Sequence, residues 1–308
     1  MRIFLALLLI LAFVVPFGVA CNEPTAPAGA IVDDMGRAIE LDRYPERIVS
    51  LAPSCTEMLF ALGLGDKVVG VTTYCNYPEE ALSKEKVGGF SPSTWNTEKI
   101  LDLQPDLVVV SGGIQLENVA ALEKLGLTVF VFEPKSIEDV LGSLETLGKL
   151  TGREKEAQSL TGDMRKRIDA VISKTQGMSD DQKIRVLLVV WSDPLGTYAG
   201  DRLETELIEK AGGTNIANVT GKQGYVKIDL EIVIQQDPQV MVAYTGMGTG
   251  GDSTLNWAKT ESRLAGTTAR IEGCIYKMNS DVIGRAGPRT VDALEQLAKC
   301  IHPEVFGE

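Results

Sequence analysis

The spacing of apolar residues between positions 136 and 174 predicts two consecutive amphipathic helices. In the first helix, one buried face is formed by Ile137, Val140, Leu141, Leu144, Leu147 and Leu150. Ser136 and Asp139 have the spacing of a capping box, and Gly152 is suited to ending that helix. The apolar face of the second helix carries Ala157, Leu160, Met164, Ile168, Val171 and Ile172. The pair is either an ordinary set of surface helices or a rigid spine between two lobes.

Short apolar runs alternate with helical patterns on both sides of this segment, which is typical of a mostly parallel sheet. Residues 31–42 predict a hairpin, and strands are expected at 47–51, 67–72, 106–111 and 128–132. Helices are expected at 56–62, 97–105 and 116–125. We therefore predict an α/β protein with an N-terminal lobe at 31–134, a helical spine at 135–176 and a C-terminal lobe at 177–308.

Two short motifs occur once in each half of the chain and in the same order. The motifs are Thr56-Glu57 with Gly63, matched by Thr205-Glu206 with Gly212, and Glu98 with Pro105, matched by Glu231 with Pro238. We interpret them as a duplication, in which the second copy lacks about 16 residues around the strand at 67–72. Ligands of open α/β sheets bind beyond the carboxyl ends of the strands, so a cleft between the lobes is the expected site.

The N-terminus has the features of an export signal. Arg2 precedes an apolar run at 3–15, and the small residues Gly18-Val19-Ala20 stand immediately before Cys21. This arrangement resembles a lipobox, which would remove residues 1–20 as a signal peptide, attach lipid to Cys21 and leave 21–30 as a flexible tether. The alternatives are cleavage by an ordinary signal peptidase, without lipid, and an apolar helix that stays uncleaved as a membrane anchor. Each of them places the protein outside the cytoplasm, at the outer face of the cytoplasmic membrane if it is anchored.

Charge and cysteine content narrow the function further. The formal net charge of −12 argues against nucleic acid as a partner. An exported protein can form disulfides, and the simplest pairings join Cys55 to Cys75 and Cys274 to Cys300, with free thiols as the alternative. The spacings between the cysteines do not resemble those of a zinc site.

Few residues offer catalytic chemistry. His302 is the single histidine and is expected to be a surface residue of the tail, so a metal site with several histidines is excluded. A Ser–His–Asp site would require that His302 reach the cleft. The glycine-rich run at 245–251 lacks the Lys-Ser/Thr of a phosphate-binding loop and is expected to be a loop at the edge of the cleft.

Aromatic residues and one charged pair are better candidates for ligand binding. The aromatic residues Phe90, Trp95, Trp191, Tyr198 and Tyr225 occur in predicted loops, and we expect them to line the cleft and suit a large, partly apolar ligand. Asp281 and Arg285 would lie on one face of a helix. They either form a local ion pair or contact the ligand.

Several stretches together resemble a known family of lipid-anchored substrate-binding proteins, which serve ABC importers of cobalamin and iron–siderophores. The stretches are Asp33 to Arg37, Arg47 to Ser54, Thr56-Glu57, Tyr77-Pro78, Val87 to Phe90, Glu98 to Val109, and Ser280-Asp281 with Arg285, Pro288 and Arg289. The resemblance implies two Rossmann-like lobes on a rigid helical spine. It also implies a monomeric, non-enzymatic protein that delivers its ligand to a permease dimer.

Within that family the chain is most similar to the cobalamin binders. The likeness implies that cobalamin or a related corrinoid is the transported ligand, with no cofactor, and that Phe90 or Trp95 stacks on it. Tyr225, Asp281 and Arg285 would also contact the ligand. Ala211 and Ala298 stand where the family carries a disulfide of the C-terminal lobe.

The family also implies that Glu98 and Glu231 dock onto the two halves of the permease. The local alternative is that each acid stabilises the first turn of its own helix. Three other functions are possible for the whole protein: binding of a ferric siderophore or haem, a chelatase-like enzyme acting on tetrapyrroles, and a purely structural lipoprotein.

Overall fold

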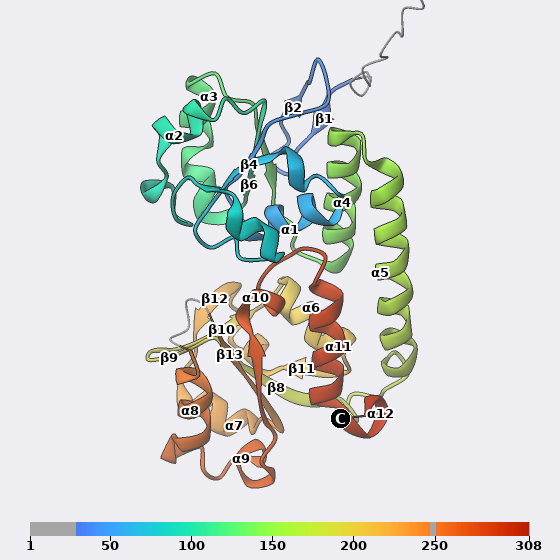
Figure 1. Cartoon of the computed structure of the whole chain (residues 1–308). Coiled ribbons are helices and arrows are strands. Elements are labelled where there is room, and N and C mark those ends of the chain that lie inside the picture. The colour runs from blue at the N-terminus through green and yellow to red at the C-terminus, as the bar shows by residue number, and fades with distance from the viewer. Residues whose placement is uncertain (1–28, 247–250, 308) are drawn as a thin grey trace, which may run out of the picture.

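The protein consists of two α/β lobes placed on the same side of a pair of long helices (Figure 1). The computed structural model describes residues 29–246 and 251–307. The predicted signal peptide, Cys21 and most of the tether therefore lie outside the described residues, as does part of the glycine-rich run. Within the described ranges, no helix is both long enough and apolar enough to span a membrane.

The spine consists of α4 (Ile137–Thr151) and α5 (Glu154–Thr175). The predicted capping box is confirmed, because the Ser136 hydroxyl accepts from the Asp139 amide at 3.0 Å and the Asp139 carboxylate accepts from the Ser136 amide at 3.1 Å. Gly152 ends α4 with φ of 68°, a left-handed conformation that favours glycine. The helix therefore begins and ends where the sequence predicts.

The N-terminal lobe contains a five-stranded parallel sheet in the order β5-β4-β3-β6-β7 and the predicted hairpin, β1-β2. Its strands are β1 (Ile31–Val32), β2 (Ala38–Ile39), β3 (Ile48–Ser50), β4 (Val68–Val71), β5 (Glu85–Lys86), β6 (Leu107–Ser111) and β7 (Val129–Phe132). Its helices are α1 (Pro53–Ala61), α2 (Thr97–Asp102) and α3 (Val119–Lys124), with 3-10 turns at Gly65–Lys67, Glu79–Ser83, Pro92–Thr94 and Gly113–Asn118.

The C-terminal lobe contains a four-stranded parallel sheet in the order β11-β8-β13-β14 and a small antiparallel sheet in the order β12-β10-β9. Its strands are β8 (Ile184–Val189), β9 (Trp191–Ser192), β10 (Leu195–Ala199), β11 (Gly213–Asn215), β12 (Gly224–Lys227), β13 (Val240–Thr245) and β14 (Ile275–Asn279). Its helices are α6 (Leu203–Lys210), α7 (Leu230–Gln236), α8 (Ser253–Thr260), α9 (Thr268–Glu272), α10 (Ser280–Ile283), α11 (Thr290–Ile301) and α12 (Pro303–Phe306), with 3-10 turns at Ile216–Thr220 and Ser262–Leu264.

The two parallel sheets share one strand order, which supports the duplication. Strands β4-β3-β6-β7 of the first lobe correspond to β11-β8-β13-β14 of the second. Strand β11 occupies the position equivalent to β4, and the missing residues lie around it as predicted. Glu206 stands 7 residues before β11, whereas Glu57 stands 11 before β4, and most of the shortening follows the strand, where residues 216–229 take the place of 72–96.

One apolar core runs through both lobes and the spine. It joins Leu59 of α1, Leu144 of α4 and Leu207 of α6, all fully buried. Two further clusters cover the remaining faces of the two sheets. Because truncating a buried leucine to alanine typically costs about 2–5 kcal/mol, the spine stabilises both lobes rather than only connecting them.

Two expectations from the sequence concern cysteine and histidine. All four described cysteines are free thiols, so neither proposed disulfide forms and the alternative holds. Burial raises the pKa of the Cys55 thiol to about 12.

The expectation that His302 is a surface residue was wrong, because its side chain is buried and its Nε2 lies 3.1 Å from the Gly212 carbonyl. The short helix α12 after His302 folds this end of the chain against the lobe.

Candidate functional site

A cleft of about 770 Å³ lies between the two lobes. Segments that follow β3, β6, β7, β8 and β14 contribute to its lining, so it lies beyond the carboxyl ends of both parallel sheets. The cleft therefore lies at the interlobe position predicted from the sequence.

The small antiparallel sheet supplies an aromatic wall on the C-terminal side of the cleft. Trp191, Tyr198 and Tyr225 lie on β9, β10 and β12 and all line the cavity. The rings of Tyr198 and Tyr225 are 5.9 Å apart in an edge-to-face arrangement. A Cβ at Gly196 would meet the Tyr225 hydroxyl at 2.0 Å, so the glycine leaves room for that phenol to lie across β10.

Phe90 lines the opposite side of the cleft, and a buried amide holds its loop. The side-chain nitrogen of Gln115 donates to the carbonyl oxygens of Leu51 at 2.7 Å and Phe90 at 3.0 Å. Trp95 does not line the cleft and was predicted wrongly. It is 8% exposed and belongs to the core of the N-terminal lobe, packed there by the bridge between Gly88 and Trp95.

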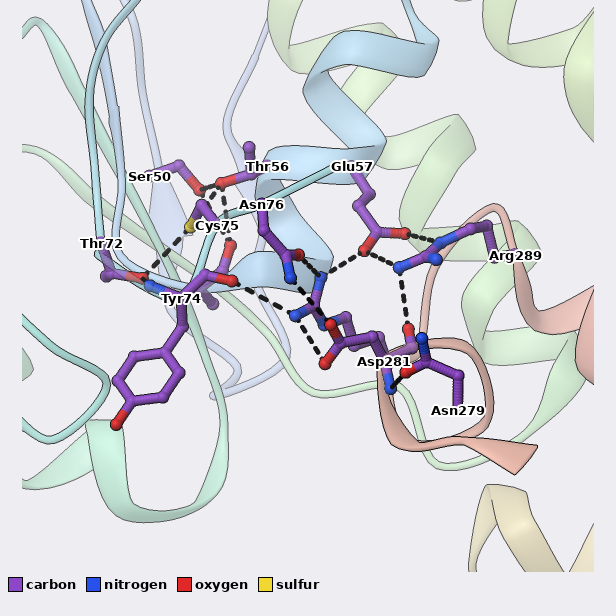
Figure 2. A network of polar contacts seen from close by, with 12 residues as sticks. Ser50, Thr56, Glu57, Thr72, Tyr74, Cys75, Asn76, Asn279, Asp281 and Arg289 are labelled. Atoms are coloured by element: carbon purple, nitrogen blue, oxygen red, sulfur yellow. Dashed lines mark hydrogen bonds and ion pairs between the residues drawn. The ribbon is translucent and has the colours of Figure 1, made fainter. Parts of the chain in front are cut away.

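An ion cluster joins the lobes at one edge of the cleft (Figure 2). Glu57 of α1 is 2% exposed and receives two hydrogen bonds from Arg289, at 2.6 and 2.7 Å, and one from Arg285 at 2.9 Å. Asn76 donates to Asp281 at 2.9 Å and accepts from Arg285 at 2.7 Å. We call Glu57, Asn76, Asp281, Arg285 and Arg289 the interlobe ion cluster. Two arginines from the loop between α10 and α11 are thereby bound to the N-terminal lobe.

Asp281 and Arg285 form the local ion pair that was one of their two predicted roles. Their side chains are 2.8 Å apart at a spacing of four residues, and both also line the cleft. The two terminal nitrogens of Arg285 already contact Glu57, Asn76, Asp281 and the carbonyl of Tyr74. A ligand that uses the Arg285 guanidinium must therefore share it with this cluster.

The cations that line the described cleft are each close to a carboxylate. Arg285 pairs with Asp281 at 2.8 Å, Arg202 with Glu204 at 3.5 Å, and Lys135 with Glu133 at 4.0 Å. Desolvation raises the pKa of the buried Glu204 carboxyl, and burial raises the pKa of Tyr198 to about 12. The cleft thus combines aromatic surface with charges that largely cancel.

Several lining residues were missed by sequence reasoning. Tyr244 lies inside strand β13, where an aromatic residue suggests core packing, and Phe132 likewise ends a buried strand. Tyr74 and Arg202 follow a strand and precede a helix, positions that could have identified them. Among the described residues, no group of three or more histidine, cysteine, aspartate or glutamate side chains could hold a metal ion.

Glu98 and Glu231 are in equivalent positions on the two lobes. Each is exposed in the first turn of its helix, α2 or α7, and neither forms an ion pair with another described residue. Three residues further on, Leu101 and Ile234 are also exposed, at 37% and 46%. Each lobe therefore presents an acid and an aliphatic side chain on one short helix.

The two lobes, the spine and the interlobe cleft define a ligand-binding protein of the type that captures small molecules outside the cytoplasm. The model of the periplasmic binding protein family matches residues 48–282, and the chain belongs to that family. Its members are non-enzymatic substrate-binding proteins of ABC transporters.

Three similar proteins illustrate the range of the family. An uncharacterized ABC transporter substrate-binding lipoprotein, YvrC of Bacillus subtilis, is 32% identical over 90% of this chain and 87% of its own length. The periplasmic vitamin B12 binding protein BtuF of Vibrio cholerae is 30% identical, with a TM-score of 0.70 over 83% of this chain and 96% of that one. A periplasmic heme binding protein from Pseudomonas aeruginosa is 26% identical, with a TM-score of 0.73 over 85% and 94%.

Proposed function

We propose that this protein captures cobalamin or a related corrinoid outside the cytoplasm and delivers it to the permease of an ABC importer. The observation that carries this proposal is the aromatic cleft whose lining cations are each close to a carboxylate. A corrinoid is a broad ring with neutral amide side chains, so it matches apolar walls without needing an excess of positive charge. The similarity to a vitamin B12 binding protein supports the same ligand.

Haem or a ferric siderophore is the second candidate, and one observation favours it. Tyr74 and Tyr225 are 41% and 49% exposed in the cleft, and phenol oxygens can ligate ferric iron. Haem and most ferric chelates carry carboxylates or other anionic groups, for which this cleft offers no unpaired lining cation among its described residues.

A chelatase-like enzyme fits poorly, because the buried His302 is held against Gly212 and is not among the lining residues. A purely structural role leaves the aromatic cleft without a purpose.

A titration with several ligands tests the proposal. The mature protein is titrated with cobinamide, cobalamin, haem and a ferric siderophore, and quenching of tryptophan fluorescence is followed. We expect corrinoids to bind most tightly and the double variant Trp191→Ala, Tyr225→Ala to weaken corrinoid binding by at least tenfold, about 1.4 kcal/mol. The control is Tyr44→Ala, since Tyr44 packs beside Gly152 near the spine. Tighter binding of haem or of the ferric chelate than of any corrinoid would refute the ligand assignment.

We propose further that Glu98 and Glu231 dock the protein onto the two halves of a permease dimer. Two exposed acids on equivalent helices suit a partner with two-fold symmetry that presents basic residues, and such charge pairs set orientation and on-rate. Leu101 and Ile234 would add apolar contact beside each acid. A lipid on Cys21 would keep the monomeric protein at the outer face of the membrane, where the permease lies.

A further inference from the structure

The C-terminal side of the cleft contains buried polar atoms that form no hydrogen bond with a described residue. The side chain of Tyr244 lines the cavity and is 3% exposed, yet its hydroxyl forms no hydrogen bond with any described residue. The Nε of Arg202, which also lines the cavity, is buried and likewise lacks a hydrogen bond. Because buried polar groups are almost always hydrogen-bonded in native proteins, two such groups in one cleft indicate that something else satisfies them.

The two groups are linked through Tyr198. The guanidinium carbon of Arg202 lies 5.3 Å from the centre of the Tyr198 ring, and the Tyr244 ring centre lies 6.5 Å from that of Tyr198. Glu204 lies behind them, with a carboxylate oxygen 3.5 Å from the Arg202 Nε. This spacing permits charge compensation, but the carboxylate oxygen is itself left without a hydrogen bond. The arrangement is therefore a neutral polar patch with unused hydrogen-bonding capacity.

We propose that Tyr244 and Arg202 form a subsite for a carboxamide side chain of the ligand. The Arg202 Nε–H donates to the amide carbonyl oxygen, and the amide N–H donates to the Tyr244 hydroxyl oxygen. A primary amide offers an acceptor for the Arg202 Nε–H and donor hydrogens for the Tyr244 oxygen. The inference deepens the proposed function, because it names the chemical group by which a corrinoid is recognised at this end of the cleft.

Charge discriminates against a carboxylate at this subsite. A carboxylate could accept from the Tyr244 O–H and the Arg202 Nε–H, but it would bring a second anion beside Arg202, whose charge Glu204 already balances. Like charges in a partly desolvated site repel each other strongly. Glu204 is therefore the positioning residue that selects an amide over an acid.

The test compares two corrinoids that differ in these groups, cobinamide with amides and cobyrinic acid with carboxylates. Tyr244→Phe removes only the hydroxyl, and we expect it to weaken cobinamide binding about five- to tenfold. Tyr44→Phe, a hydroxyl removed away from the cleft, should leave binding unchanged. Glu204→Gln keeps the size of the side chain and removes the competing anion, so it should narrow the preference for cobinamide over cobyrinic acid. Melting temperatures of all variants verify folding.

The outcomes distinguish failure of the proposed function from failure of the subsite. If the parent binds no corrinoid, the proposed function and this subsite are both overturned. If the parent binds cobinamide and the folded Tyr244→Phe variant binds it equally well, the subsite alone is overturned. If cobyrinic acid binds the parent as tightly as cobinamide does, selection of the amide by Glu204 is wrong.

Discussion

Removing the charge of Glu57 should loosen the two lobes from each other. The change Glu57→Gln keeps the shape of the side chain but leaves Arg285 and Arg289 without the carboxylate that they share. Arg285 is 8% exposed and Glu57 is 2% exposed, so solvent cannot replace that carboxylate. Breaking one side of a buried ion pair typically costs about 3–5 kcal/mol.

A matched surface pair shows how much of this cost comes from burial. Arg165 holds Glu138 with two hydrogen bonds at 2.6 and 2.7 Å, but the two side chains are 43% and 70% exposed. Exposed pairs of this kind contribute only about 0.2–1 kcal/mol. At about 2–4 °C per kcal/mol, Glu57→Gln should lower the melting temperature by about 10 °C and Glu138→Gln by less than about 4 °C.

The assay is thermal unfolding followed by circular dichroism, together with hydrogen exchange. Faster exchange in the Glu57→Gln variant is expected in α1 and in the loop between α10 and α11, where the interlobe ion cluster joins the lobes. Equal, small changes in melting temperature for both variants would refute the reasoning. That result would mean that the buried cluster does not hold the lobes together.

Three other measurements test separate features. Reversing Glu98 and Glu231 to lysine should abolish transport with ligand affinity and melting temperature unchanged, whereas surviving transport with lower stability would contradict docking. Arg167, at 2.7 and 2.9 Å from Glu295, lowers the carboxyl pKa below its ordinary 4.5, so its stabilisation is present above that pH and is lost as the pH falls through the folded pKa. Arg167→Gln should therefore lower the melting temperature more near neutral pH than in acid below the folded pKa of Glu295, and equal effects would contradict this. X-ray scattering should show little compaction on ligand binding, because the α4–α5 spine packs into both lobes; a large decrease in radius of gyration would contradict a rigid spine.

Local signals in the sequence predicted the scaffold well. Capping by Ser136, the left-handed Gly152 and the strands of the first lobe depend on neighbouring residues, so short windows contain the necessary information. The fold class followed from the alternation of these elements, and the matching strand orders of the two sheets agree with the repeated motifs.

The site was harder to predict, because burial depends on contacts that are distant in the chain. Trp95 was expected in a loop like the other aromatic candidates, yet its segment folds onto the core of the first lobe. The expectation of loops was also wrong for Trp191, Tyr198 and Tyr225, which lie on strands β9, β10 and β12. Tyr244 belongs to a buried strand and still lines the cleft, since it lies toward the carboxyl end of β13. The partners Glu57 and Arg289 are separated by 232 residues, and no periodicity reveals such a contact.

The aromatic wall is separate from the duplicated frame. It stands on β9, β10 and β12, a sheet that pairs with neither parallel sheet and rests on the second lobe through Leu195 and Val226. Mutations on its cleft face can therefore accumulate without disturbing the strand pairing that holds each lobe together. Such modularity makes the small sheet the natural place for ligand preference to diverge during evolution, and a suitable segment to exchange when the carrier is re-engineered for another cargo.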